Sequence, residues 1–257
     1  MNDAAMIESE RAEADAWLDL VAAAPSPLAS AIGLVAGRDD SGTWVRCKAI
    51  PAGVFNRRFD VPRSRSIADI PTDEGLWLQL PETRADDIAS LRARGMIDAP
   101  WPAWTKLVWP DHSRAAGTPD PNIGTVARDE ALAWAQVIGS AHGMPPAAAP
   151  WIAALVDRPR WHTLAWRSEG TIVSGAALFV DEGRAWLGLG GTLPEFRGRG
   201  AQSSLLRARI DLARSLGVAT IASETGSPLA GKPNTSLTNM LRAGLVSVGQ
   251  RINLVAR

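Results

Sequence analysis

Residues 191–206, GTLPEFRGRGAQSSLL, join an apolar strand pattern to an apolar helix pattern through a loop that alternates arginine and glycine. Pro194 ends the strand, and we expect the helix to begin near Ala201. Glycine adopts backbone conformations closed to other residues, so Gly198 and Gly200 can turn the chain and expose their N–H groups. Amide groups at a helix N-terminus favour an anion, and arginine matches the geometry of phosphate oxygens. The stretch therefore predicts a phosphate-binding loop between a strand and a helix.

Two other interpretations of this loop are an ordinary surface turn and an arginine-rich arm that binds RNA. An RNA-binding arm needs more Arg-Gly repeats, interleaved aromatic residues and a basic balance. This chain has 27 Lys and Arg against 27 Asp and Glu, a formal net charge of zero. The loop also lacks the Gly-Lys-Ser/Thr ending of a P-loop and the Gly-x-Gly-x-x-Gly pattern of a dinucleotide fold.

The elements around the loop form a regular series in the second part of the chain. Alternating apolar residues predict three strands joined by Ser168-Glu169-Gly170 and Asp181-Glu182-Gly183 hairpin turns. Two helices precede these strands, and the helix after the loop is followed by a strand, a short helix and a last strand. The predicted ranges are helices 127–143 and 145–159, strands 161–167, 171–180 and 184–192, strand 218–224, helix 234–244 and strand 245–256.

The first part of the chain also mixes helices and strands, and a Pro-rich segment at 111–123 is expected to separate the two parts. LRARGM (91–96) and LRAGLV (241–246) each end a helix on Leu-Arg, close it with glycine and enter an apolar stretch. This is either a common helix ending or the trace of two copies of one α/β unit. We predict domains at 1–110 and 124–257 with a linker at 111–123.

The stretch P-E-F-R-G-R-G-A-Q-S-S-L-L resembles the pyrophosphate-binding motif of the GNAT acyltransferases, Arg/Gln-x-x-Gly-x-Gly/Ala, with Arg197, Gly200 and Gln202 in its three positions. Gln202 departs from the usual Gly or Ala. SLTNMLRAGL resembles the family's second cofactor motif, with Leu245 in place of the usual Phe. The resemblance implies an α/β (α+β) fold, a mixed and mostly antiparallel sheet flanked by helices, in two tandem GNAT-like domains of which the first is degenerate.

The resemblance further implies acetyl-CoA as cosubstrate and acetyl transfer to the amine of a small molecule or amino-acid-like acceptor by direct attack. The alternative is a non-catalytic, acetyl-CoA-binding regulatory module. The residues expected to bind the cofactor are Gly190, Gly191, Thr192, Arg197, Gly198, Arg199, Gly200, Ala201, Gln202, Ser203 and Asn239.

Many relatives use a tyrosine as general acid, and this chain has none. Water or a hydroxyl of Ser236 or Thr238 would protonate the thiolate, or the thiolate leaves unaided. Glu224 ends a strand, where ligands of α/β sheets tend to bind, and is the candidate base. Its other interpretation is a structural carboxylate that caps a turn or pairs with an arginine.

One cysteine and three scattered histidines argue against a disulfide and a metal site. No stretch approaches about 18 uninterrupted apolar residues, and the first residues lack the pattern of a signal peptide. We therefore expect a cytoplasmic protein, a monomer or homodimer, with no nucleic-acid partner, no membrane partner and no metal.

Overall fold

The computed structural model describes residues 3–110 and 118–256, in which eleven strands form one sheet. The order across the sheet is β1-β2-β3-β4-β11-β5-β10-β9-β8-β7-β6. The strands are β1 (Leu34–Asp39), β2 (Gly42–Cys47), β3 (Arg57–Phe59), β4 (Trp77–Pro81), β5 (Ile97–Val108), β6 (Ile123–Thr125), β7 (Trp161–Ser168), β8 (Thr171–Asp181), β9 (Arg184–Thr192), β10 (Thr220–Gly226) and β11 (Val246–Val255).

One pattern of strand pairing occurs twice. Strands β1 to β4 pair antiparallel, antiparallel and then parallel, and β7 to β10 repeat this series. The strand that follows each series pairs with the last strand of the other series: β5 pairs with β10, and β11 pairs with β4. The strands β5 and β11 also pair with each other in the middle of the sheet. The fold is therefore a tandem α/β arrangement in which hydrogen bonds run across the predicted domain boundaries; the boundaries themselves stay a prediction.

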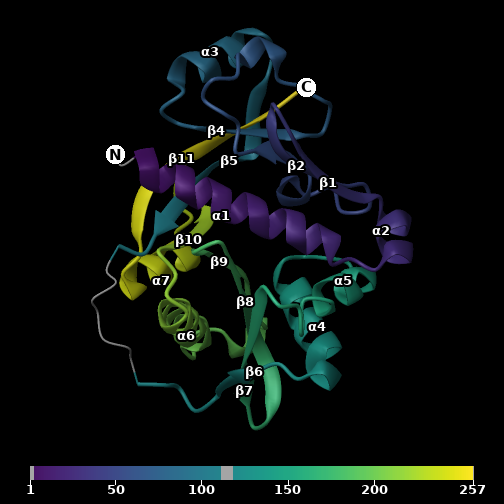
Figure 1. The fold of residues 1–257 in the computed structure, drawn as a ribbon, viewed down its shortest axis with the longest axis vertical. Coiled ribbons are helices and arrows are strands. Elements are labelled where there is room, and N and C mark those ends of the chain that lie inside the picture. Colours follow the sequence, from purple (N-terminus) through teal and green to yellow (C-terminus); the bar gives the residue numbers. More distant parts are fainter. Residues whose placement is uncertain (1–2, 111–117, 257) are drawn as a thin grey trace.

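One face of the sheet is covered by α1 (Asp3–Ala22), α2 (Ser26–Ile32), α4 (Ala131–Ala141) and α5 (Ala149–Ala153). Figure 1 shows α1 crossing the middle of the molecule, between the N-terminal half above and the C-terminal half below. Its Trp17 is buried against Phe55 of the first half and Trp186 of the second. Helix α1 therefore covers the seam between the two halves.

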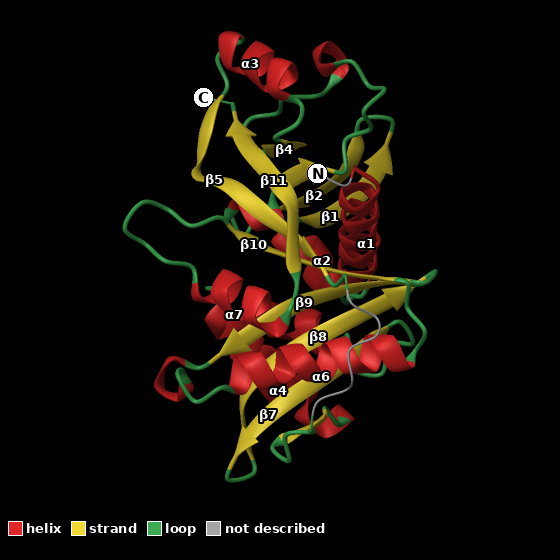
Figure 2. Cartoon of the chain, turned by 90° about the vertical axis from the view of Figure 1, so that its left-hand side faces the viewer, coloured by secondary structure: helices red, strands yellow, loops and turns green. Residues whose placement is uncertain are grey.

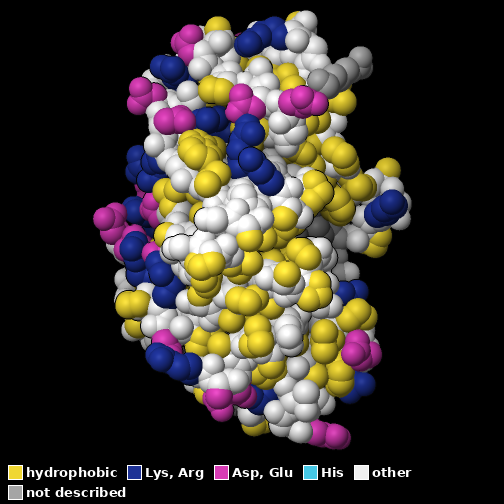
Figure 3. Space-filling model, turned by 90° about the vertical axis from the view of Figure 1, so that its right-hand side faces the viewer, with side chains coloured by type: hydrophobic (Ala, Val, Ile, Leu, Met, Phe, Trp, Pro, Cys, Tyr) yellow, Lys and Arg dark blue, Asp and Glu magenta, His cyan; other side chains and the backbone are white. Residues whose placement is uncertain are grey.

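The opposite face is covered by α3 (Ala85–Ala93), α6 (Ala201–Ser215) and α7 (Thr235–Ala243). Figure 2 shows α3 over the upper strands and α6 and α7 over the lower ones. Strand alternation sends Ala222 to the α1 face and Ile221 to the α6 face. The face shown in Figure 3 has many hydrophobic side chains in its middle, with charges of both signs interspersed nearer its margin.

The predicted elements lie close to the observed ones where local signals are strong. Asn234 caps α7 by accepting a hydrogen bond from the Leu237 amide at 3.0 Å, and Gly244 ends it in the left-handed conformation. The sequence analysis missed two strands of three residues, β3 and β6. Much of the predicted linker, residues 111–117, lies outside the described residues.

Candidate functional site

The loop between β9 and α6 turns on two glycines in the left-handed region. Gly198 and Gly200 have φ of +79° and +86°, which other residues rarely adopt. Gly200 is the N-cap of α6, and no side chain caps this helix or places a negative charge in its first turn. The first N–H groups of α6 are therefore left for another acceptor. This geometry fits the phosphate-binding loop that the sequence predicts.

Two exposed arginines flank this cradle. The Arg197 Nε atom donates a hydrogen bond to the Thr192 carbonyl at 3.3 Å, which fixes the start of the loop against the end of β9. The Arg199 guanidinium lies 4.9 Å from the centroid of the Phe196 ring. Both side chains add positive charge at the positive end of the α6 dipole.

The parallel strands β9 and β10 separate beside this loop. Their last paired residues are Trp186 and Ala222. Beyond them the strands are linked by side chains: the Ser223 hydroxyl donates to the Leu187 carbonyl at 2.9 Å, and the Trp186 indole donates to Glu224. The pairing of β9 with β8 shifts register in the same region, and Leu189 has a φ of +53°. The end of β9 is therefore irregular and partly released from its neighbours, so its backbone groups can meet a ligand.

The two glycines of this irregular segment, Gly190 and Gly191, differ in the space around them. A Cβ at Gly191 would lie 2.6 Å from the Cβ of Ala141, so this glycine lets the end of α4 pack against β9. A Cβ at Gly190 would meet nothing closer than an Arg209 nitrogen at 3.8 Å. Close approach of α4 accounts for the glycine at 191, and its contact with the cofactor stays a prediction.

These elements enclose a pocket of about 810 Å³ between the end of α4, the end of β9, the loop and α7. Of the eleven predicted cofactor residues, all but Arg199 line it, and so does the candidate acid Ser236. The lining consists of Ala141, His142, Gly190, Gly191, Thr192, Phe196, Arg197, Gly198, Gly200, Ala201, Gln202, Ser203, Thr235, Ser236, Asn239 and Arg242.

Gln202 links the two helices that border the pocket. The Asn239 side-chain amide donates to the Gln202 Oε1 atom at 2.8 Å, and the Gln202 Nε2 atom donates to the Ser236 hydroxyl at 3.1 Å. Gln202, the residue that departs from the motif, thus links the first turn of α6 to α7 by two hydrogen bonds. Thr238, the other hydroxyl considered, donates to the Asn234 carbonyl and does not line the pocket.

Arg209 supports the irregular segment from the α6 side. It is 3% exposed, and its Nη1 atom donates to the carbonyls of Ala177 and Gly188 at 2.9 Å each. Burial lowers the pKa of Arg209 to about 10, so it remains a cation at neutral pH. A buried cation thus holds two carbonyls where β8 and β9 lose their register.

The comparison with protein families agrees with this geometry. Residues 124–230 match the acetyltransferase (GNAT) family, a segment that runs from β6 through the loop and α6 to the end of β10. Residues 124–230 form a GNAT acetyltransferase domain. No curated protein matches the chain.

Solved GNAT structures share the fold over most of the chain. A GCN5-related N-acetyltransferase from Sphaerobacter thermophilus is 14% identical with a TM-score of 0.60, over 86% of this chain and 75% of that one. A GCN5-related N-acetyltransferase from Kribbella flavida is 17% identical with a TM-score of 0.54, over 99% and 95%. A tandem GNAT protein from the clavulanic acid biosynthesis pathway is 12% identical with a TM-score of 0.54, over 86% and 77%. At these identities the likeness is one of fold.

Glu224 of the GNAT domain lies on the face of the sheet that α1 and α4 cover, beneath α1. Its side chain is 5% exposed, accepts a hydrogen bond from Trp186 Nε1 at 2.9 Å and pairs with Lys106 at 3.4 Å. It does not line the pocket. The structure therefore gives Glu224 the arrangement of a buried structural carboxylate, and its role as a base stays a prediction.

Glu224 belongs to a buried charge cluster that we define as Glu13, Arg57, Lys106, Glu224 and Arg251. Glu13 on α1 is fully buried, lies 2.7 Å from Arg57 and 2.8 Å from Lys106, and pairs with Arg251. Burial alone would raise the pKa of Glu13, but the three cations hold it well below its usual value. Burial raises the pKa of Glu224, and the charge of Glu13 adds to this.

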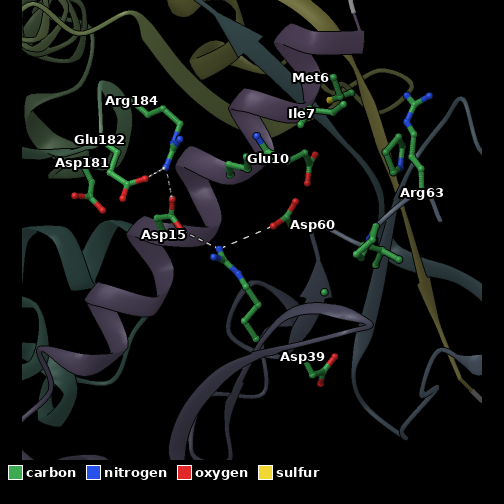
Figure 4. Close-up of a pocket in the computed structure, with 16 residues that line it drawn as sticks. Met6, Ile7, Glu10, Asp15, Asp39, Asp60, Arg63, Asp181, Glu182 and Arg184 are labelled. Atoms are coloured by element: carbon green, nitrogen blue, oxygen red, sulfur yellow. Dashed lines mark hydrogen bonds and ion pairs between the residues drawn. The ribbon is translucent and has the colours of Figure 1, made fainter. Parts of the chain in front are cut away.

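A second pocket, of about 760 Å³, lies between α1, the start of the N-terminal sheet and the turn between β8 and β9. Figure 4 shows Asp60 and Glu10 facing each other in it, with Asp15 between Arg184 and the arginine that reaches Asp60. That arginine is Arg38, which lies 2.8 Å from Asp15 and 4.0 Å from Asp60. This pocket is a network of ion pairs at the seam.

Over residues 3–110 and 118–256, no group of three or more His, Cys, Asp or Glu is placed to hold a metal ion. In the same ranges no helix has the length and apolar character needed to span a membrane.

Two residues at the pocket, Arg209 and His142, were not predicted from the sequence. Arg209 lies four residues after Leu205 and four before Ala213, so the helical spacing puts it on the buried face of α6, although its charge suggests exposure. His142 ends α4, far along the chain from the motif, and reaches the pocket only because Ala141 packs on Gly191. Both depend on contacts between distant segments.

Proposed function

We propose that this protein is an acetyl-CoA-dependent N-acetyltransferase that acts on the amine of a small molecule or amino-acid-like acceptor. The observation that supports this is the single pocket that gathers ten of the eleven residues expected to bind the cofactor. The loop geometry fits a diphosphate, since the uncapped start of α6 and two left-handed glycines offer amide groups to its oxygens. Arg197 adds a charge-assisted contact.

The pantetheine arm would follow the end of β9, where backbone groups near Gly190 and Thr192 are available to it. This path leads towards the point at which β9 and β10 separate. In the reaction, a neutral amine attacks the thioester carbon, a C–N bond forms, the C–S bond breaks and the amine nitrogen loses a proton. Ser236 lines the pocket and is the candidate donor for the thiolate; Arg209 holds the backbone from behind.

A non-catalytic, acetyl-CoA-binding module is the second candidate. It is favoured by the absence of tyrosine and by the position of Glu224, which is buried away from the pocket lining. Such a protein would bind acetyl-CoA without accelerating transfer.

Calorimetry with acetyl-CoA tests the site. The double variant Arg197→Ala, Arg199→Ala is expected to weaken binding at least about tenfold, because a hydrogen bond to a charged group contributes roughly 1.5–3 kcal/mol. Arg207→Ala, at an exposed arginine in the second turn of α6, is the matched control and should bind as the parent does. Unchanged affinity in the double variant would remove the site assignment.

A thiol-release assay with a panel of amines tests the activity. Thiol release above the acetyl-CoA hydrolysis background with at least one amine supports the transferase. Tight acetyl-CoA binding without any amine-dependent release would favour the regulatory module instead.

A further inference from the structure

The pocket holds one side chain that can exchange a proton near neutral pH. Among its described lining residues, Arg197 and Arg242 are always cations, the hydroxyls do not ionise, and no carboxylate is present. The remaining titratable group is His142. A proton acceptor inside the pocket is therefore an imidazole.

The fold holds His142 beside the irregular end of β9. Its backbone N–H donates to the carbonyls of Ile138 and Gly139 at 3.1 and 3.2 Å, so it belongs to the last turn of α4. The neighbouring Ala141 packs closely on Gly191, where there is no room for a Cβ, and this contact holds the last turn of α4 against β9. His142 is thus anchored next to Gly190, on the opposite side of β9 from Arg209.

The surroundings of His142 favour its neutral form. Desolvation lowers the pKa of His142, and a hydrogen bond with the Gly190 backbone opposes this only in part. The charged residues beside it in the pocket lining are Arg197 on the loop and Arg242 on α7, and Arg209 of α6 lies behind β9. Helix α4 itself carries no charge, and Glu195 of the loop does not line the pocket. A neutral imidazole can accept a proton, and no facing carboxylate stabilises its charged form.

We propose that His142 is the base of the acetyl transfer, and this rests on the proposed function. The imidazole takes the proton from the acceptor nitrogen as its C–N bond to the acetyl carbon forms. The C–S bond breaks with its electron pair going to sulfur, and the proton ends on the thiolate, so that an amine and acetyl-CoA give an amide and coenzyme A. Glu224, whose carboxylate is engaged by Trp186 and Lys106, takes no part.

The test compares His142→Gln with Glu224→Gln, using the full chain and the amine that gives thiol release. General base catalysis contributes about 10²- to 10⁴-fold, so His142→Gln is expected to lower kcat by at least about 100-fold. Acetyl-CoA affinity by calorimetry should stay within about twofold, since the base does not hold the cofactor. His162→Gln is the control, because His162 lies on β7 and does not line the pocket.

The pH profile separates a base from a structural residue. The neutral imidazole is the active form and the pKa of His142 is lowered, so the activity of the parent should fall with pH only below the ordinary His range. This fall in activity at low pH should be absent in His142→Gln. A fall caused by protonation of the amine substrate itself should remain in both proteins. Added imidazole should restore part of the activity of His142→Ala.

Three results would overturn the assignment. If the parent transfers acetyl and His142→Gln keeps kcat within about threefold, His142 is not the base, and the proposed function stands. A fall in activity at low pH that remains in His142→Gln but is absent in Glu224→Gln would assign the base to Glu224. A parent without transfer to any amine would remove both proposals together.

Discussion

Asp60 provides a stability test whose sign and size follow from the structure. It lies in the second pocket, opposite Glu10 and 4.0 Å from Arg38, with 24% of its side chain exposed. Burial and the charge of Glu10 raise the pKa of Asp60 to about 6, from 3.8. A shift of one pKa unit corresponds to 1.36 kcal/mol, so ionised Asp60 costs the fold on the order of 3 kcal/mol.

The sign follows from proton linkage. Between pH about 4 and 6 the folded chain holds the Asp60 proton more tightly than the unfolded chain, so this contribution to stability is lost as the pH rises through that window. Asp60→Asn removes the ionisation and keeps the side-chain shape. Asparagine also tolerates the φ of +52° found at this position. The variant should therefore be more stable than the parent at pH 8.

Thermal unfolding followed by circular dichroism measures the effect. At about 2–4 °C per kcal/mol for a chain of this size, Asp60→Asn should raise Tm at pH 8 by roughly 6–12 °C. The gain should shrink as the pH is lowered from 6 towards 4, because the folded chain then holds the Asp60 proton, and it should vanish below 3.8, where the unfolded chain is protonated as well. A lower Tm at pH 8, or a gain that does not depend on pH, would refute the reasoning.

Asp39→Asn is the matched control with the opposite sign. Asp39 lines the same pocket, but its carboxylate accepts hydrogen bonds from Arg58 and the Ser41 amide at 2.7 Å each. Although burial opposes them, these partners lower the pKa of Asp39. Its contribution is present above its ordinary pKa and lost as the pH falls, so Asp39→Asn should lower Tm at pH 8.

Three further predictions concern buried polar contacts. Glu13→Gln should cost about 3–5 kcal/mol in urea unfolding, because it leaves three buried cations without their shared partner; Glu8→Gln, on the outer side of α1, is the control and should cost under about 1 kcal/mol. Arg209→Met should cost about 1–3 kcal/mol by leaving the Ala177 and Gly188 carbonyls unpaired, and an unchanged urea midpoint would contradict the proposed support of β9. Gln202→Ala should speed amide hydrogen exchange in the first turn of α7, because it breaks the links to Ser236 and Asn239; unchanged exchange there would show that the links do not stabilise α7.

The sequence predicted the pocket wherever its residues lie in one local pattern. The turn at Gly198 and Gly200, the uncapped start of α6 and the Asn234 cap of α7 all depend on neighbours in the chain. Their chemistry is readable because local backbone preferences decide it. His142 could not be found in this way, since its place depends on how α4 packs against β9.

The central strands show the same limit on a larger scale. Lys106 reads as an exposed charge in the pattern of β5, yet it is fully buried, because β5 leaves its own half and pairs with β10. The side chains of Gln79 and Asn253 hydrogen bond at 2.7 Å although they are 174 residues apart. Pairings of such separation carry no local signal, so neither the crossing strands nor the polar seam was predictable.

The strand crossing also explains why Glu224 is held away from the pocket. In the repeated pairing, Gln79 of β4 lies opposite Asn253 of β11, and Glu224 of β10 occupies the matching place opposite Lys106 of β5. One half therefore fills this position with a pair of neutral amides, and the other fills it with an ion pair that α1 covers through Glu13. The cover makes a carboxylate tolerable there, since three cations offset the cost of burying it. The same cover commits Glu224 to the seam, whereas the base that we propose, His142, lines the pocket.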